Sequence, residues 1–110
     1  MASFYVEVSL VDGELIRHIS YVVLADNYEL AAQAAICSES YSADMDWSGE
    51  YVRDLENKHL YRACATELSD VEAAIMRKHV KTIQAQPNKL YASGNYRTQK
   101  IIKAVVPNSK

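Results

Sequence analysis

The segment Asp44-Met-Asp46-Trp-Ser48-Gly49 has the residue types of a calcium-binding loop. Such a loop places oxygen ligands at positions 1, 3 and 5 and a glycine where the chain turns sharply. It also needs a glutamate at position 12. Leu55 stands at that position here, and Glu56 comes one place late. The sequence therefore favours a solvated acidic turn, and a calcium-dependent module or small enzyme around residues 44–56 is the last-ranked alternative.

Imidazole and thiolate groups could also bind zinc, and the chain has three histidines and two cysteines, namely His18, His59, His79, Cys37 and Cys64. No two of them have the C-x-x-C or H-x-x-x-H spacing of a zinc site. Both cysteines lie in apolar stretches, where free cysteine usually acts as a small buried hydrophobe. We therefore predict no metal ion and no cofactor.

Nucleophilic and phosphate-binding chemistry has no sequence signature in this chain. There is no G-x-S-x-G, no P-loop and no G-x-G-x-x-G. The three glycines, Gly13, Gly49 and Gly94, each fit a turn. Carboxylates do acid–base work only where a cleft perturbs them, so we expect a protein that is not an enzyme.

Length and composition indicate one globular domain. A chain of 110 residues with 49% hydrophobic and 24% charged residues can bury its own core, so we predict a single domain over residues 1–106 and a frayed tail over 107–110. Two cysteines are too few for a secreted disulfide framework, and the first residues do not resemble a signal peptide, which favours a cytoplasmic protein. The longest wholly apolar run, residues 21–25, is far shorter than the ~20 residues of a membrane span.

The charges are divided along the chain. Residues 1–75 carry fourteen acidic and four basic side chains, net −10, whereas residues 76–110 carry eight basic side chains and no acidic one, net +8. A surface of one sign concentrates partners of the opposite sign. The pattern predicts a charged partner but does not identify its class.

Residues 3–24 alternate between apolar and polar side chains as strands do. Asp12-Gly13 interrupts the alternation and suits a two-residue hairpin turn, since both residues tolerate positive φ. With this turn Leu10 faces Leu15 and Val8 faces Arg17, and the large apolar groups share one face. The sequence predicts a β-hairpin.

Two helices have N-terminal signals. The first should begin near Asp26 or Asn27 and present Leu30, Ala34, Cys37 and Tyr41 on one face. The second begins with the capping box Ser69-x-x-Glu72 and extends to about Ala85, before Pro87. Its apolar stripe comprises Val71, Ile75, Met76, His79 and Ile83, which favours a core or sub-surface position for His79.

Further strands are predicted over residues 50–55, 59–65 and 101–106. The element order is then β-β-α-β(β)-α-β. This order predicts an α+β fold with an antiparallel or mixed sheet of four or five strands and two helices on one face.

We expect a non-enzymatic binding or inhibitor protein that acts on a protein or nucleoprotein partner. Its binding surface would be acidic and aromatic, because carboxylates can occupy sites made for phosphates. The residues predicted for this surface are Asp44, Asp46, Trp47, Glu50 and Asp54. In size, single-domain build and lack of catalytic signatures the chain resembles the small inhibitor proteins that phages and mobile elements encode, for example for counter-defence.

The alternative is a nucleic-acid-binding regulator that uses the basic C-terminal third. Tyrosines among cations can stack on bases while the cations neutralise phosphates. The residues predicted for this surface are Arg77, Lys78, Lys81, Lys89, Tyr91, Tyr96, Arg97, Lys100 and Lys103. A homodimer is also left open, because the opposite charges could pair between two subunits.

Overall fold

The computed structural model describes residues 1–40, 45–47, 51–85 and 102–104. Its elements are β1 (Ala2–Asp12), β2 (Leu15–Ala25), α1 (Tyr28–Glu39), β3 (Met45–Asp46), β4 (Val52–Asp54), β5 (Leu60–Leu68), α2 (Asp70–Met76), β6 (Lys81–Gln84) and β7 (Ile102–Ala104). The predicted α+β fold class is confirmed.

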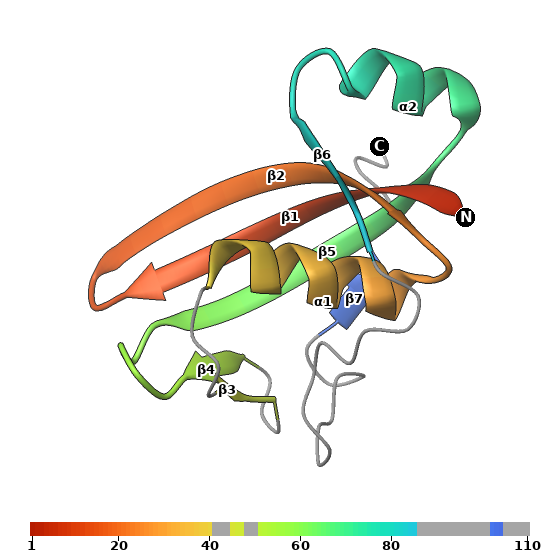
Figure 1. Ribbon diagram of the computed structural model, residues 1–110. Helices are drawn as coiled ribbons and strands as arrows, with labels where there is room; N and C mark the ends of the chain where they lie inside the picture. The colour runs from red at the N-terminus through yellow and green to blue at the C-terminus, as the bar shows by residue number, and fades with distance from the viewer. Residues whose placement is uncertain (41–44, 48–50, 86–101, 105–110) are drawn as a thin grey trace.

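One mixed sheet organises the molecule (Figure 1). Six strands lie in the order β3-β4-β5-β1-β2-β6, and β7 also pairs with β5. β1 lies between β2 and β5 and runs antiparallel to both, whereas β6 runs parallel to β2 and β7 runs parallel to β5. The sheet is larger than the predicted four or five strands because the short strands β3 and β6 were not recognised in the sequence.

The β1–β2 hairpin turns one residue later than predicted. Asp12 pairs with Leu15, so Gly13 and Glu14 are the two turn residues. Gly13 has a φ of 64°, and Glu14 does not share a positive φ, which is the pattern of a type II′ turn with glycine first. Leu10 therefore faces Arg17 instead of Leu15. The pairing shifts by two residues, which leaves every side chain on its predicted face.

α1 covers the face of the sheet that carries Phe4, Val6 and Val8, here called the inner face. Asn27 caps the helix, and its Oδ1 accepts a hydrogen bond from the Leu30 N–H at 2.8 Å. The six consecutive residues from Ala31 to Ile36 are all buried, because alanine side chains let the helix approach the sheet closely. The predicted helix start is confirmed, but the helix is buried around more of its circumference than the predicted stripe.

The second helix is much shorter than predicted. The capping box of Ser69 and Glu72 is present, but α2 ends at Met76, and residues 81–84 form β6 beside β2. The apolar stripe was therefore misassigned, and His79 is exposed instead of lying in the core. Tertiary pairing outweighed the helix propensity of residues 81–84, because as a strand they bond to β2 and pack Ile83 against the core.

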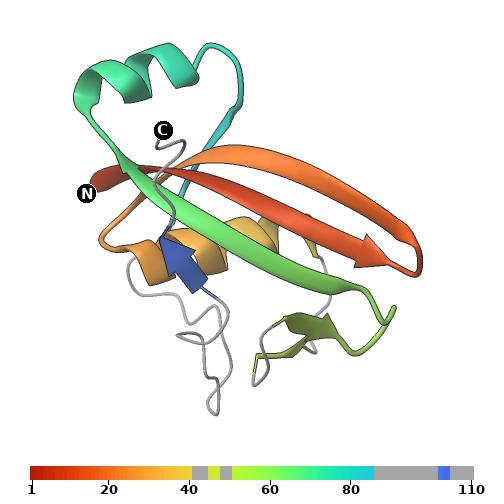
Figure 2. The ribbon, with the colours of Figure 1, turned by 180° about the vertical axis from the view of Figure 1, so that it is seen from behind.

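The two helices lie on different faces of the sheet. α2 forms an apolar groove with Tyr5, which points away from the inner face, and Arg77 Nη2 donates to Ser3 Oγ at 3.3 Å. The view from behind shows α2 at the end of the sheet where β1 begins and β5 ends (Figure 2). The prediction that both helices cover one face is wrong.

The last predicted strand is present in part. β7 lies within the predicted residues 101–106 and pairs with Ala63–Ala65 of β5. Across the described residues, neither α1 nor α2 is long and apolar enough to span a membrane.

Candidate functional site

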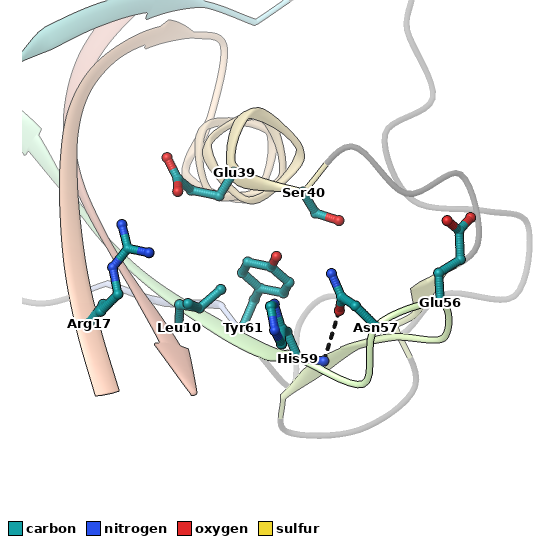
Figure 3. A pocket seen from close by; sticks show the side chains of 8 residues that line it. All are labelled: Leu10, Arg17, Glu39, Ser40, Glu56, Asn57, His59 and Tyr61. Atoms are coloured by element: carbon teal, nitrogen blue, oxygen red, sulfur yellow. Dashed lines mark hydrogen bonds between the residues drawn. The ribbon is translucent and has the colours of Figure 1, made fainter. Parts of the chain in front are cut away.

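A polar pocket of about 300 Å³ opens at the end of the inner face where α1 ends (Figure 3). Three parts of the fold meet there: the hairpin, the C-terminal end of α1 and the turn between β4 and β5. The lining residues are Leu10, Arg17, Glu39, Ser40, Glu56, Asn57, His59 and Tyr61. Most of these side chains are polar or charged, so the pocket suits a polar ligand.

The floor of the pocket is one row of residues across three strands. Tyr61 of β5 pairs with Leu10 of β1, and Leu10 pairs with Arg17 of β2. Paired residues point to the same face, so all three side chains lie beneath the end of α1. Tyr61 and Leu10 are buried, whereas Arg17 is exposed at one side of the pocket.

The last residues of α1 form a wall of the pocket. Glu39 accepts a hydrogen bond from the Tyr21 hydroxyl through Oε2. The Ser40 N–H closes the helix on Ile36 O at 3.0 Å, and the Ser40 hydroxyl donates to Asp54 Oδ2 at 2.7 Å. The end of the helix is thereby linked to β4.

Asp54 holds the turn that forms the opposite wall. Its side chain is fully buried, and Oδ1 accepts from the N–H groups of Glu56 at 2.9 Å and Asn57 at 3.3 Å. Lys58 completes the turn with a φ of 69°. The His59 N–H then donates to Asn57 Oδ1 at 2.9 Å. This turn presents Glu56, Asn57 and His59 to the pocket.

The pocket has an excess of negative charge. Glu39 and Glu56 line it, and Asp54 lies directly behind Ser40. The negative end of the α1 dipole adds to these carboxylates, and the last turn of α1 contains no basic residue. Among the lining residues, Arg17 is the only arginine or lysine. The imidazole Nε2 of His59 lies 3.3 Å from Asp12 Oδ2 and is directed to that carboxylate.

The surroundings of Tyr61 in the pocket raise the pKa of its hydroxyl. Burial raises the pKa of the Tyr61 hydroxyl above its ordinary value, the hydrogen bond with Ser40 lowers it, and the Asp54 and Glu39 carboxylates raise it further. The burial effect is the largest, so the hydroxyl is protonated at neutral pH and can donate a hydrogen bond.

Two of the five residues predicted for the acidic surface are buried. Trp47 is 3% exposed and Asp54 is fully buried, so neither can be part of a surface. Trp47 belongs to the hydrophobic core, and the Asp54 carboxylate is taken up by Ser40 and the turn. Asp46 is exposed, as predicted. Asp44 and Glu50 lie outside the described residues, so only Met45, Asp46 and Trp47 of the predicted calcium-like segment are described.

The predicted basic surface is described only in part. Arg77, Lys78 and Lys81 are exposed between the end of α2 and the start of β6. Lys103 belongs to β7 and is in register with Cys64. The remaining residues of that set, namely Lys89, Tyr91, Tyr96, Arg97 and Lys100, lie outside the described part of the chain.

The described residues give no support to a metal cluster or to Ser40 as a nucleophile. Within the described ranges, no three His, Cys, Asp or Glu residues stand close enough to hold an ion. The Ser40 hydroxyl donates its single proton to Asp54, whereas a Ser–His nucleophile would direct that proton to the imidazole.

The sequence did not single out Arg17, Glu39 or Tyr61 as site residues. Arg17 joins the pocket only because the turn lies at residues 13–14, which brings it opposite Leu10. Glu39 could have been noticed as an acidic residue in the last turn of a helix, where a basic residue is the more favourable choice.

Comparison with models of protein families, with curated proteins and with solved structures finds no match to this chain. The chemistry of the pocket is therefore the basis for the function proposed below.

Proposed function

We propose that this protein is a non-enzymatic binding protein whose carboxylate-lined pocket takes a cationic side chain of a basic protein partner. The observation that carries the proposal is the arrangement of Glu39, Glu56 and the buried Asp54 around the negative end of α1. A guanidinium or ammonium group entering the pocket would meet charge from all three carboxylates. Arg17 would stand beside it and could bind a backbone carbonyl of the same partner.

Charge favours a cation over an anion in this pocket. An anion would have to displace Asp12 from His59 or rely on Arg17 alone, and it would be repelled by the carboxylates and the helix dipole. Partly desolvated charges interact more strongly than charges in bulk water, so the enclosed position of Glu39 increases its effect. The same reasoning makes a nucleic-acid phosphate an unfavourable ligand here.

The proposed partner is a protein whose basic groove would otherwise bind phosphates. Carboxylates held on a folded surface can occupy such a groove, which is the logic of an inhibitor that mimics nucleic acid. Asp46 is an exposed carboxylate of β3, the strand that pairs with β4 next to the pocket. We expect this interaction to take place in the cytoplasm, in keeping with Cys37 and Cys64, which form no disulfide with each other.

The test compares two double variants that remove the same charge. Glu39→Gln with Glu56→Gln neutralises the pocket and keeps the side-chain shapes, whereas Glu7→Gln with Glu67→Gln neutralises two exposed carboxylates elsewhere. The probe is a short arginine-rich peptide, with binding measured by calorimetry at low salt. The pocket variant should lose about fivefold more affinity than the control, since two partly enclosed charge contacts contribute on the order of 1 kcal/mol.

Two outcomes would contradict the proposal. Equal losses in the two double variants would mean that the peptide binds through net charge alone. The second is tight binding of a duplex oligonucleotide that is abolished by replacing Arg77, Lys78 and Lys81 with alanine, since that result favours the nucleic-acid alternative.

If the peptide binds in the pocket as proposed, it should shift the amide NMR signals of Ser40 and of residues 56–61.

A further inference from the structure

Across the residues that the structure describes, one edge of β2 is unpaired along the half of the strand next to the turn. β1 pairs with β2 along its whole length, but on the other side β6 covers only Tyr21–Leu24. Among the described residues, no strand pairs with that side of residues 15–20. Figure 1 shows β6 meeting β2 only in the half away from the turn. Leu15 and Ile16 are each 60% exposed at this edge, which makes it both apolar and open to pairing.

Alternate residues of β2 point their backbone N–H and C=O groups away from β1, where another strand could bond to them. Asp12 and Leu15 close the two-residue turn as a hydrogen-bonded pair, so Leu15, Arg17 and Ile19 direct their N–H and C=O groups toward β1. The even-numbered residues then direct theirs outward. Leu24 confirms this alternation, because its carbonyl accepts from the Ala85 N–H at 2.8 Å. Ile16, His18 and Ser20 therefore offer backbone donors and acceptors to a second strand.

We propose that a second copy of this chain pairs with this edge, so that two β2 strands join in antiparallel fashion about a two-fold axis at Ile16. The two sheets would become continuous across the dimer. An isologous contact of this kind places the same residues on both sides, so each residue must tolerate its own symmetry partner.

The charges select the register. A two-fold axis at Arg17 would place two arginines directly opposite each other, and an axis at His18 would place two imidazoles opposite each other. Like groups in these positions are unfavourable. An axis at Ile16 places Ile16 against Ile16 and Glu14 against His18 at both ends of the contact. This register sets a carboxylate opposite an imidazole that can donate a hydrogen bond to it.

The surroundings of Glu14 and His18 agree with this pairing. Ser9 Oγ lies 3.1 Å from His18 Nδ1, so the hydroxyl can donate to that nitrogen and leave the proton on Nε2 for a carboxylate. Glu14 is exposed at the turn, and in the described part of the chain it has no ion pair. On the inner face, Leu15 would lie against the aliphatic stem of Arg17 from the other copy.

The test is the oligomeric state of charge-swapped variants. Sedimentation equilibrium from about 1 µM to about 500 µM should show a dimer, which will be weak because five paired residues bury less than a standard interface. Glu14→Lys sets a lysine opposite the imidazole, and His18→Glu sets two carboxylates opposite each other, and the two-fold axis repeats each pair. Each variant should therefore weaken the dimer about fivefold or more. The double variant should recover it, since Lys and Glu then face each other.

Two further variants distinguish edge pairing from association through net charge or through a different surface. Ile16→Pro removes an outward N–H and should abolish the dimer without disturbing the β1 ladder. Glu67→Lys changes the charge equally but lies on β5, and it should leave the dimer intact. Circular dichroism checks that every variant folds. None of the residues changed here lines the pocket, so failure of this test and failure of the proposed function are distinguishable.

A wild-type protein that stays monomeric throughout this range would overturn the proposal. So would a dimer that Ile16→Pro leaves unchanged, or one that the double charge swap does not restore. A dimer weakened by the Glu39 and Glu56 variants instead would assign the contact to the pocket face.

Discussion

Asp54 joins three segments of the chain through one buried carboxylate. It accepts from the Ser40 hydroxyl at the end of α1 and from the N–H groups of Glu56 and Asn57 in the turn. A buried carboxylate is tolerated only where such donors replace water. The residue that the sequence suggested for a partner is therefore part of the frame of the pocket, where it holds the segments that carry Glu39 and Glu56.

Asp54→Ala should lower the free energy of unfolding by roughly 2–4 kcal/mol, because it leaves buried donors without an acceptor. Ser40→Ala is the control, and it should cost only about 1 kcal/mol, since the turn keeps its carboxylate. Urea denaturation measures both values. Equal costs for the two variants would show that Asp54 contributes no more than its bond to Ser40.

Tyr61 makes stability depend on pH in the alkaline range. Burial raises the pKa of its hydroxyl in the folded protein, whereas the unfolded chain releases that proton near pH 10. The stabilisation from Tyr61 is thus complete below about pH 10 and is lost as pH rises toward the folded-state pKa. Urea midpoints from about pH 8 to about pH 11 should fall less steeply in Tyr61→Phe than in the wild type. Identical slopes would contradict this account.

The hairpin sets the geometry of the site at the level of the element. Its turn at Gly13 and Glu14 determines that Arg17 stands opposite Leu10, and the same turn leaves the even-numbered residues of β2 directed outward. Among the described residues, apart from the chain neighbours of Gly13, no atom lies within 4 Å of the position of a Cβ at Gly13, so a side chain there meets a conformational penalty but no clash. The turn can therefore be tested without a steric clash.

Gly13→Val should lower the free energy of unfolding by about 1–2 kcal/mol, because a β-branched residue is strained at a φ of 64°. Gly13→Asn should cost less than about 0.5 kcal/mol, since asparagine tolerates positive φ. Thermal unfolding monitored by circular dichroism gives the comparison. Equal costs for valine and asparagine would place the strain elsewhere than in φ.

At the scale of the whole molecule, the charge division of the sequence is only partly a division in space. Glu39 and Glu56 lie at the hairpin end of the sheet, whereas Arg77, Lys78 and Lys81 follow α2 at the opposite end (Figures 1 and 3). Asp70 and Glu72 in the first turn of α2 lie at the basic end, so the separation is incomplete. Both proposed contacts lie at the hairpin end of the sheet. The cationic partner would bind in the pocket on the inner face, and the second copy would pair with the edge of β2.

Local patterns in the sequence determined the elements with strong short-range signals. The alternation of residues 3–24 determined which side chains of the hairpin face the core, and Asn27 and Ser69 marked both helix starts. These features depend on neighbours within four residues, where capping and periodicity act. The α+β class followed from their order.

Only the tertiary structure decided the rest. Residues 81–84 joined β2 as a strand although their pattern was helical, because hydrogen bonds to a distant edge outweighed local propensity. Asp54 became buried because Ser40, fourteen residues earlier in the chain, supplied a donor. The pocket brings together residues as distant as Leu10 and Tyr61, and such proximity depends on strand pairing across the sheet, which no local pattern specifies.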